Sequence, residues 1–126
     1  MAETTYMSEQ ICDLFTPAGK YISLHTADPG FTGANELTTG NDANYVRKPV
    51  TLVKTLDGST YRVRNSADVV MATAAAGASY TISHLCVWSA VTGGDCLAVL
   101  PLLTGIPVTT GGIVTFATNA IEVRGE

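Results

Sequence analysis

Short runs of alternating hydrophobic and polar residues cover most of this chain. In residues 21–25, Ile22 and Leu24 share one face while Tyr, Ser and His take the other, which is the two-residue period of a half-buried strand. Clusters of Gly, Pro, Asn and Asp separate such runs. The pattern predicts further strands at residues 46–53, 61–64, 67–76, 80–90, 96–102, 113–117 and 120–124.

Two of these strands are expected to form a hairpin early in the chain. Residues 61–64 follow Asp57-Gly58 and are the expected partner of residues 46–53. Pro49 lacks a backbone N–H, so residues 46–53 should lie at a sheet edge or carry a bulge.

A second hairpin is predicted near the middle of the chain. Residues 80–90 carry apolar side chains on both faces, which indicates a central strand, and the glycine-rich turn at 92–95 returns the chain as residues 96–102. Residues 67–76 combine helix-favouring alanines with strand-favouring valines, and we interpret them as a strand with an irregular end.

One helix is predicted, at residues 4–15. Met7, Ile11, Leu14 and Phe15 are spaced to form one apolar stripe along it. A threonine at its start is expected to cap it, and the proline and glycine that follow should end it.

Residues 31–44 form the longest predicted loop. The turn Asp28-Pro29-Gly30 leads into it, and Leu37 is its only internal aliphatic residue. Loops of this length usually have a function or are mobile, so we consider this one a candidate contact element.

The 126 residues, with a mass of 13.1 kDa, leave room for one ordinary domain, residues 1–126. Charged residues make up only 14% of the chain and hydrophobic ones 46%, with 12 glycines, so short strands and turns are favoured over long surface helices. The expected fold is mainly β, a single-domain β-sandwich or jelly-roll-like barrel with one short N-terminal helix.

Charge and hydropathy exclude several classes of partner. Seven basic and eleven acidic residues give a net charge of −4, so we expect no binding of free nucleic acid. No apolar run reaches the ~20 residues of a membrane helix, and the N-terminus lacks the pattern of a signal peptide. Three cysteines, Cys12, Cys86 and Cys96, form no CxxC motif and are interpreted as reduced thiols, although their disulfide state stays open.

No residue pattern supports an enzyme, a metal or a cofactor. His84 and Cys86 would share a strand face and could form a thiolate–imidazole couple, but a core position for the cysteine is the simpler interpretation. The nearest acidic groups, Asp28 with His25 or Glu36 with Asp42, have no recognised ligand spacing. Phosphate-binding glycine loops are also missing from the sequence.

Two possible binding surfaces remain open. Trp88, Tyr61 or Tyr80 could read a carbohydrate, although core packing is favoured for Trp88. Four basic residues fall on the predicted hairpin of residues 46–53 and 61–64, either as a solvated face or as a salt-sensitive docking site for an acidic subunit.

Several motifs resemble small structural proteins of tailed bacteriophages. The chain has Pro17, then Tyr21, then Leu-His-Thr-Ala-Asp-Pro-Gly at residues 24–30, and Asn-Tyr-Val-Arg at residues 44–47. The stretches at residues 82–95 and 110–116 extend the resemblance over nearly the whole chain. Members of that group are labelled tail-fibre-like or minor virion proteins, and the resemblance implies no active site.

We therefore expect a non-enzymatic virion protein, a homo-oligomer made in the bacterial cytoplasm and placed on the particle surface. Because the chain has no heptads or repeats for a fibre shaft, the first hypothesis is a capsid decoration protein docked on the major capsid protein. The alternative is a small tail or tail-fibre component with host-surface binding. The candidate interface residues are Met7, Ile11, Phe31, Asn35, Leu37, Arg47, Lys48, Arg62 and Arg64.

Overall fold

A computed structural model describes residues 4–125, which form one helix and nine strands. Within them no helix is long and apolar enough to cross a bilayer. The elements are α1 (Thr5–Asp13), β1 (Lys20–His25), β2 (Lys48–Val50), β3 (Leu52–Asp57), β4 (Thr60–Asn65), β5 (Val69–Val70), β6 (Ser79–Trp88), β7 (Cys96–Thr109), β8 (Thr115–Phe116) and β9 (Glu122–Arg124).

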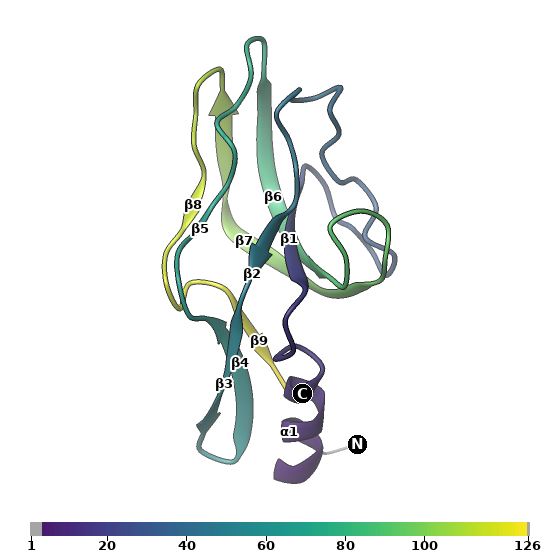
Figure 1. Cartoon of the computed structure of the whole chain (residues 1–126), viewed down its shortest axis with the longest axis vertical. Coiled ribbons are helices and arrows are strands. Elements are labelled where there is room, and N and C mark those ends of the chain that lie inside the picture. The colour runs from purple at the N-terminus through teal and green to yellow at the C-terminus, as the bar shows by residue number, and fades with distance from the viewer. Residues whose placement is uncertain (1–3, 126) are drawn as a thin grey trace.

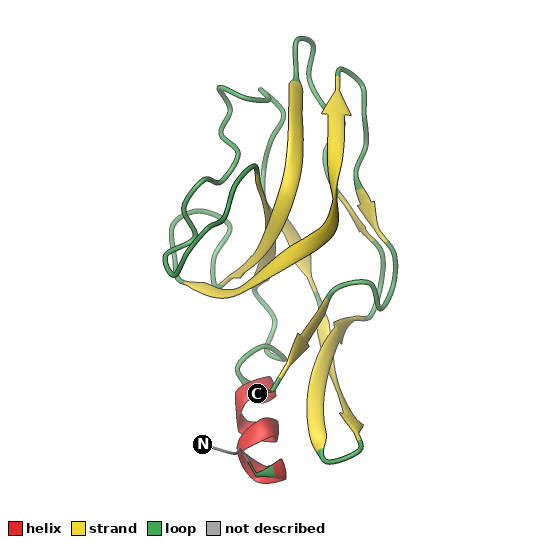
Figure 2. Ribbon diagram, turned by 180° about the vertical axis from the view of Figure 1, so that it is seen from behind, coloured by secondary structure: helices red, strands yellow, loops and turns green. Residues whose placement is uncertain are grey.

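All strand pairs are antiparallel and they form three sheets (Figures 1 and 2). The largest has the order β2-β1-β6-β7, the second the order β3-β4-β9, and β5 pairs with β8. This arrangement confirms the predicted mainly β, sandwich-like fold, whereas the jelly-roll alternative finds no support in the sheet orders. The prediction that residues 80–90 form a central strand is also confirmed, because β6 lies between β1 and β7.

The core lies against one face of the four-stranded sheet. Ile22 and Leu24 of β1 and Leu85 and Val87 of β6 pack there and are almost fully buried. On a regular strand, Ile82 and Leu85 would face opposite sides of the sheet, because they are three positions apart. The register of β6 against β7 shifts between Ile82 and His84, and both Ile82 and Leu85 are buried in the core. The irregularity therefore keeps apolar side chains on the inner face on both sides of it.

The predicted strand at residues 46–53 is divided between two sheets. β2 pairs with β1, whereas β3 pairs with β4 in the predicted hairpin. Thr51, between them, is exposed and belongs to neither strand. Pro49 lies in β2 at the edge of its sheet, the place a residue without a backbone N–H can occupy.

The predicted helix is confirmed over Thr5–Asp13 and is anchored on β3 and β4. Thr4 accepts the N–H of Met7 with its side-chain oxygen at 3.2 Å, which caps the helix. Ser8, which is buried, accepts the N–H of Tyr61 at 2.7 Å, and Lys54 of β3 lies 2.8 Å from carboxylates of the helix. These contacts fix α1 at the lower end of the molecule, beside β9 (Figure 1).

Residues 26–46, which include the predicted loop of residues 31–44, contain no regular element except a bridge between His25 and Glu36. Part of this segment covers the face of the four-stranded sheet opposite the core. Gly33 has φ +77°, and a Cβ there would overlap the Trp88 ring. The loop can approach the sheet this closely only because residue 33 has no side chain.

Candidate functional site

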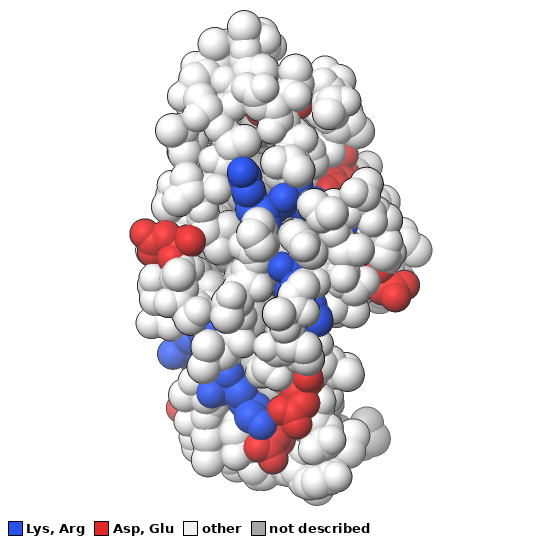
Figure 3. Space-filling view, viewed as in Figure 1, with Lys and Arg blue, Asp and Glu red and all other residues white. Residues whose placement is uncertain are grey.

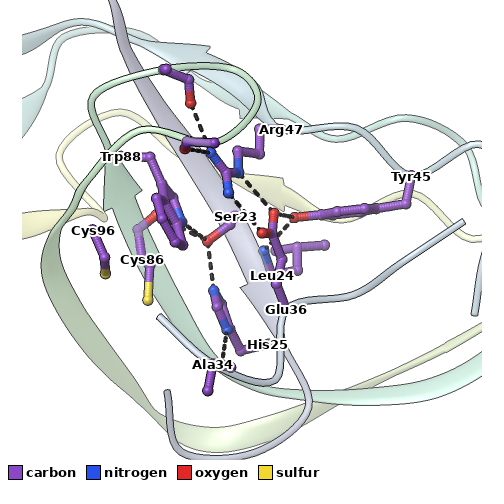
Figure 4. Close-up of polar contacts among 12 residues, drawn as sticks. Ser23, Leu24, His25, Ala34, Glu36, Tyr45, Arg47, Cys86, Trp88 and Cys96 are labelled. Carbon is purple, nitrogen blue, oxygen red and sulfur yellow. Dashed lines mark hydrogen bonds and ion pairs between the residues drawn. The ribbon is translucent and has the colours of Figure 1, made fainter. Parts of the chain in front are cut away.

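A chain of buried hydrogen bonds links the sheet to the covering loop (Figure 4). The indole N–H of Trp88 donates to Ser23 Oγ at 2.7 Å, and Ser23 Oγ lies 2.6 Å from His25 Nε2. His25 Nδ1 lies 2.7 Å from the carbonyl oxygen of Ala34. Because a carbonyl only accepts, Nδ1 carries the proton, and the Ser23 hydroxyl donates to Nε2.

This arrangement of Ser23 and His25 looks like a catalytic pair but lacks the access that catalysis needs. Both residues are fully buried, and the third member is the main-chain carbonyl of Ala34 rather than a carboxylate. Burial also lowers the pKa of His25, opposed by its bond to Ala34, so the imidazole is neutral at pH 7. These hydrogen bonds join the loop to β1 and β6.

Glu36 and Arg47 form a second link inside the same segment. The guanidinium of Arg47 makes two bonds to the carboxylate of Glu36, at 2.9 and 2.8 Å, and the Tyr45 hydroxyl donates to Glu36 Oε2 at 2.7 Å. Burial alone would raise the pKa of Glu36, but the bonds from Arg47 and Tyr45 outweigh it and hold that pKa below its usual value.

Arg47 also connects this segment to the turn between β6 and β7. It donates to the carbonyl oxygens of Ala90 and Gly93 at 2.9 and 2.8 Å, and its guanidinium carbon lies 3.8 Å from the centre of the Trp88 ring. Arg47 is 8% exposed. Its charge and most of its donors are therefore used inside the molecule.

Asp42 anchors the far end of the loop. Its carboxylate accepts the backbone N–H of Ala75 and of Asn44, each at 3.0 Å, and the hydroxyl of Tyr80 at 2.8 Å. Burial would raise the pKa of Asp42, but these three donors lower it. The carboxylate suggested as a possible ligand is thus a structural acceptor.

The predicted basic spot does not form as one surface. Arg47 and Lys48 belong to the region of β2, while Arg62 and Arg64 lie on β4 in another sheet. Both β4 arginines pair with Glu122, at 3.0 and 2.8 Å, and Arg62 also pairs with Asp57. In the view of Figure 3, basic residues occur in separate places, and those at the lower end lie beside acidic ones.

The nine candidate interface residues differ in how far they are exposed to solvent. Leu37 is 3% exposed and Arg47 is internally paired, so the structure corrects both: neither is available to a partner. Phe31 stands fully exposed, at 104%. Met7 and Asn35 are exposed, and Ile11, Lys48, Arg62 and Arg64 are half-buried.

The hypothesis of a reactive cysteine finds no support. His84 lies in contact with Ser83 through Nδ1, at 2.7 Å, while Cys86 is fully buried. Burial and the neighbouring Cys96 thiol raise the pKa of Cys86 to about 12, so it stays protonated. Among residues 4–125, no group of three His, Cys, Asp or Glu side chains could hold a metal ion.

The aromatic residues considered for carbohydrate binding are also engaged internally. Trp88 is 7% exposed beneath Arg47 and Gly33. Tyr80 donates to Asp42, and Lys54 lies over the ring of Tyr61. Face-on stacking of a sugar against Trp88 would require Arg47 to move.

An apolar groove of about 300 Å³, which the sequence pattern did not predict, lies between α1, β7 and β9. Of its lining residues, Ile11 was among the predicted interface residues, whereas Leu14 and Phe15 were predicted only as part of the apolar stripe of residues 4–15. Leu14, which lines the groove, is 65% exposed. The residues lining the groove are Ile11, Leu14, Phe15, Leu97, Ala98, Val123 and Arg124.

Comparison with known proteins identifies one family. No curated protein sequence matches this chain. The family described as Podophage GP4 fiber I protein gp80 matches residues 4–124, almost the entire chain and every element of the fold. This chain therefore belongs to the Podophage GP4 fiber I protein gp80 family, a fibre-protein family of the tailed-phage virion.

Proposed function

We propose that this chain is a non-enzymatic structural subunit of a tail fibre. The match to a podophage fibre family over residues 4–124 carries this proposal and favours the tail-fibre alternative over capsid decoration. Fully buried Ser23 and His25 and the raised pKa of Cys86 support a structural role, because these candidate nucleophiles and base are not available for reaction.

The proposal includes assembly with neighbouring virion proteins and with copies of the same chain. Thirteen large hydrophobic residues among those described are exposed, while only 14% of the whole sequence is charged. Such a surface needs little desolvation of ions when it is covered. Single exposed apolar residues are common on monomers, so the proposal depends on specific contacts rather than on their number.

Imaging of virions that lack the gene tests the location. We expect electron microscopy to show tails with missing or shortened fibres and heads of normal outline, and supply of the chain from a plasmid should restore the fibres. Loss of head protrusions, or capsids that rupture on mild heating while the tails stay complete, would instead establish the decoration function.

A further inference from the structure

Phe31 is an aromatic knob that the folded chain leaves uncovered. Its side chain is 104% exposed, although the loop around it is held by Gly33 against Trp88 and by the bond of Asn35 to the Asp28 carbonyl, at 2.9 Å. Asp28, three residues earlier, is exposed as well. The turn thus exposes an aromatic ring and, three residues away, a carboxylate whose Oδ1 accepts the N–H of Gly30 at 2.9 Å.

The groove between α1, β7 and β9 has the opposite shape and a similar polarity. Its volume of about 300 Å³ is sufficient for one aromatic side chain, since apolar cavities of about 150 Å³ accept benzene. Leu14 and Leu97, at 65% and 37% exposure, leave apolar surface open to solvent there. Phe31 is not part of its lining, although its loop approaches the β7 end of the groove, where a Cβ at Gly33 would lie 3.1 Å from Cys96, the neighbour of Leu97.

Charge complementarity indicates which chemistry fits the groove. Arg124 lines it and is 56% exposed, and Glu122, which Arg124 contacts at 3.1 Å, is shared with Arg62 and Arg64. Arg124 is therefore the charged residue that the groove offers to an incoming carboxylate, because Arg62 and Arg64 lie outside its lining. Residues 26–46 contain three acidic and no basic residues, and Asp28 is the one that is exposed.

We propose that Phe31 of one copy inserts into the groove of a second copy, with Asp28 placed toward Arg124. This inference rests on the proposed function, for which it supplies the contact between subunits. A second copy is the favoured occupant because one chain carries both the aromatic and acidic projection and the apolar and basic recess. Because knob and groove are different surfaces, each copy can both receive and donate a contact.

Two variants of the full chain, each disabled on one surface, test the pairing. Phe31→Ser removes the knob, and Leu14→Glu places a negative charge at the groove. By sedimentation velocity, each should weaken self-association at least about thirty-fold, the effect of losing an interface hot spot. Mixed in equal amounts, the two variants should form a 1:1 dimer, because the mixture retains one intact knob and one intact groove.

Matched control variants test whether a loss of association comes from lower surface hydrophobicity in general or from unfolding. Leu103→Ser alters an equally exposed residue of β7, at 108%, and Tyr6→Glu adds the same charge to an exposed face of α1, at 68%. Both should associate like the wild type. The inference is overturned if the controls lose association equally, if the mixture stays monomeric, or if the wild type is monomeric at about 100 μM. Virion imaging remains independent, so a tail fibre built from this chain through other contacts would contradict only the inference.

Discussion

At the residue scale, Gly33 decides how closely the loop can approach Trp88. Gly33→Ala should lower the free energy of unfolding by about 3 kcal/mol, because the new methyl group would overlap the indole in a conformation that disfavours any side chain. Gly30→Ala is the control: its φ is +62°, but nothing lies within 4 Å, so only the conformational cost of about 1 kcal/mol applies. Equal losses in urea unfolding would show that the Trp88 contact is unimportant.

His25 should make stability depend on pH. Its pKa in the folded protein is lowered, chiefly by burial, so the unfolded state binds more protons below about pH 6.5. The free energy of unfolding should therefore be constant above that pH and fall as the pH decreases from 6.5 to 5.5. Unfolding curves across this range measure the slope. His25→Gln, which does not titrate, should flatten it, and an unchanged slope would assign the effect to other groups.

At the element scale, Arg47 holds the loop to the turn between β6 and β7. Arg47→Met leaves Glu36 half-buried without its counter-charge and should cost about 3 kcal/mol. Amide exchange in residues 26–46 should rise at the same time. Arg64→Met, which removes a 35% exposed partner of Glu122, is the control and should cost less than about 1 kcal/mol. If both variants lose the same free energy, the Arg47 link is no stronger than a surface pair.

The elements differ in how far the sequence could predict them. Alternation located β1 and β6, and the apolar stripe located α1, because these signals are local. The separation of β2 from β3 depends on which sheet each segment meets, and Thr51 carries no local sign of it. The pairing of Glu36 with Arg47 spans eleven residues of loop, and the groove combines three distant segments, so neither follows from periodicity or spacing.

At the scale of the whole molecule, the fold depends on packing rather than on cross-links. Cys12 and Cys86 are fully buried, with pKa values raised by that burial, and Cys96 is partly exposed. A thiol reagent should therefore label Cys96 first and the other two only on unfolding, and reducing agent should leave the melting temperature unchanged. Rapid labelling of Cys86 in the native protein, followed by mass spectrometry, would revive the reactive-cysteine hypothesis.

The response of self-association to salt separates two ways in which copies of this chain could meet. If Phe31 enters the groove, apolar burial dominates and the pair of Asp28 with Arg124 adds at most about 1 kcal/mol at the rim. Screening also weakens the mutual repulsion of copies that each carry a net charge of −4. These effects oppose each other, so the dissociation constant should change less than about five-fold between 0.05 and 0.5 M salt.

Docking of an acidic surface on the arginines around Glu122 would be weakened far more strongly, because each charge pair would be screened. Sedimentation at the two salt concentrations therefore distinguishes an apolar contact from an ionic one, and a large rise in the dissociation constant would favour the arginine cluster.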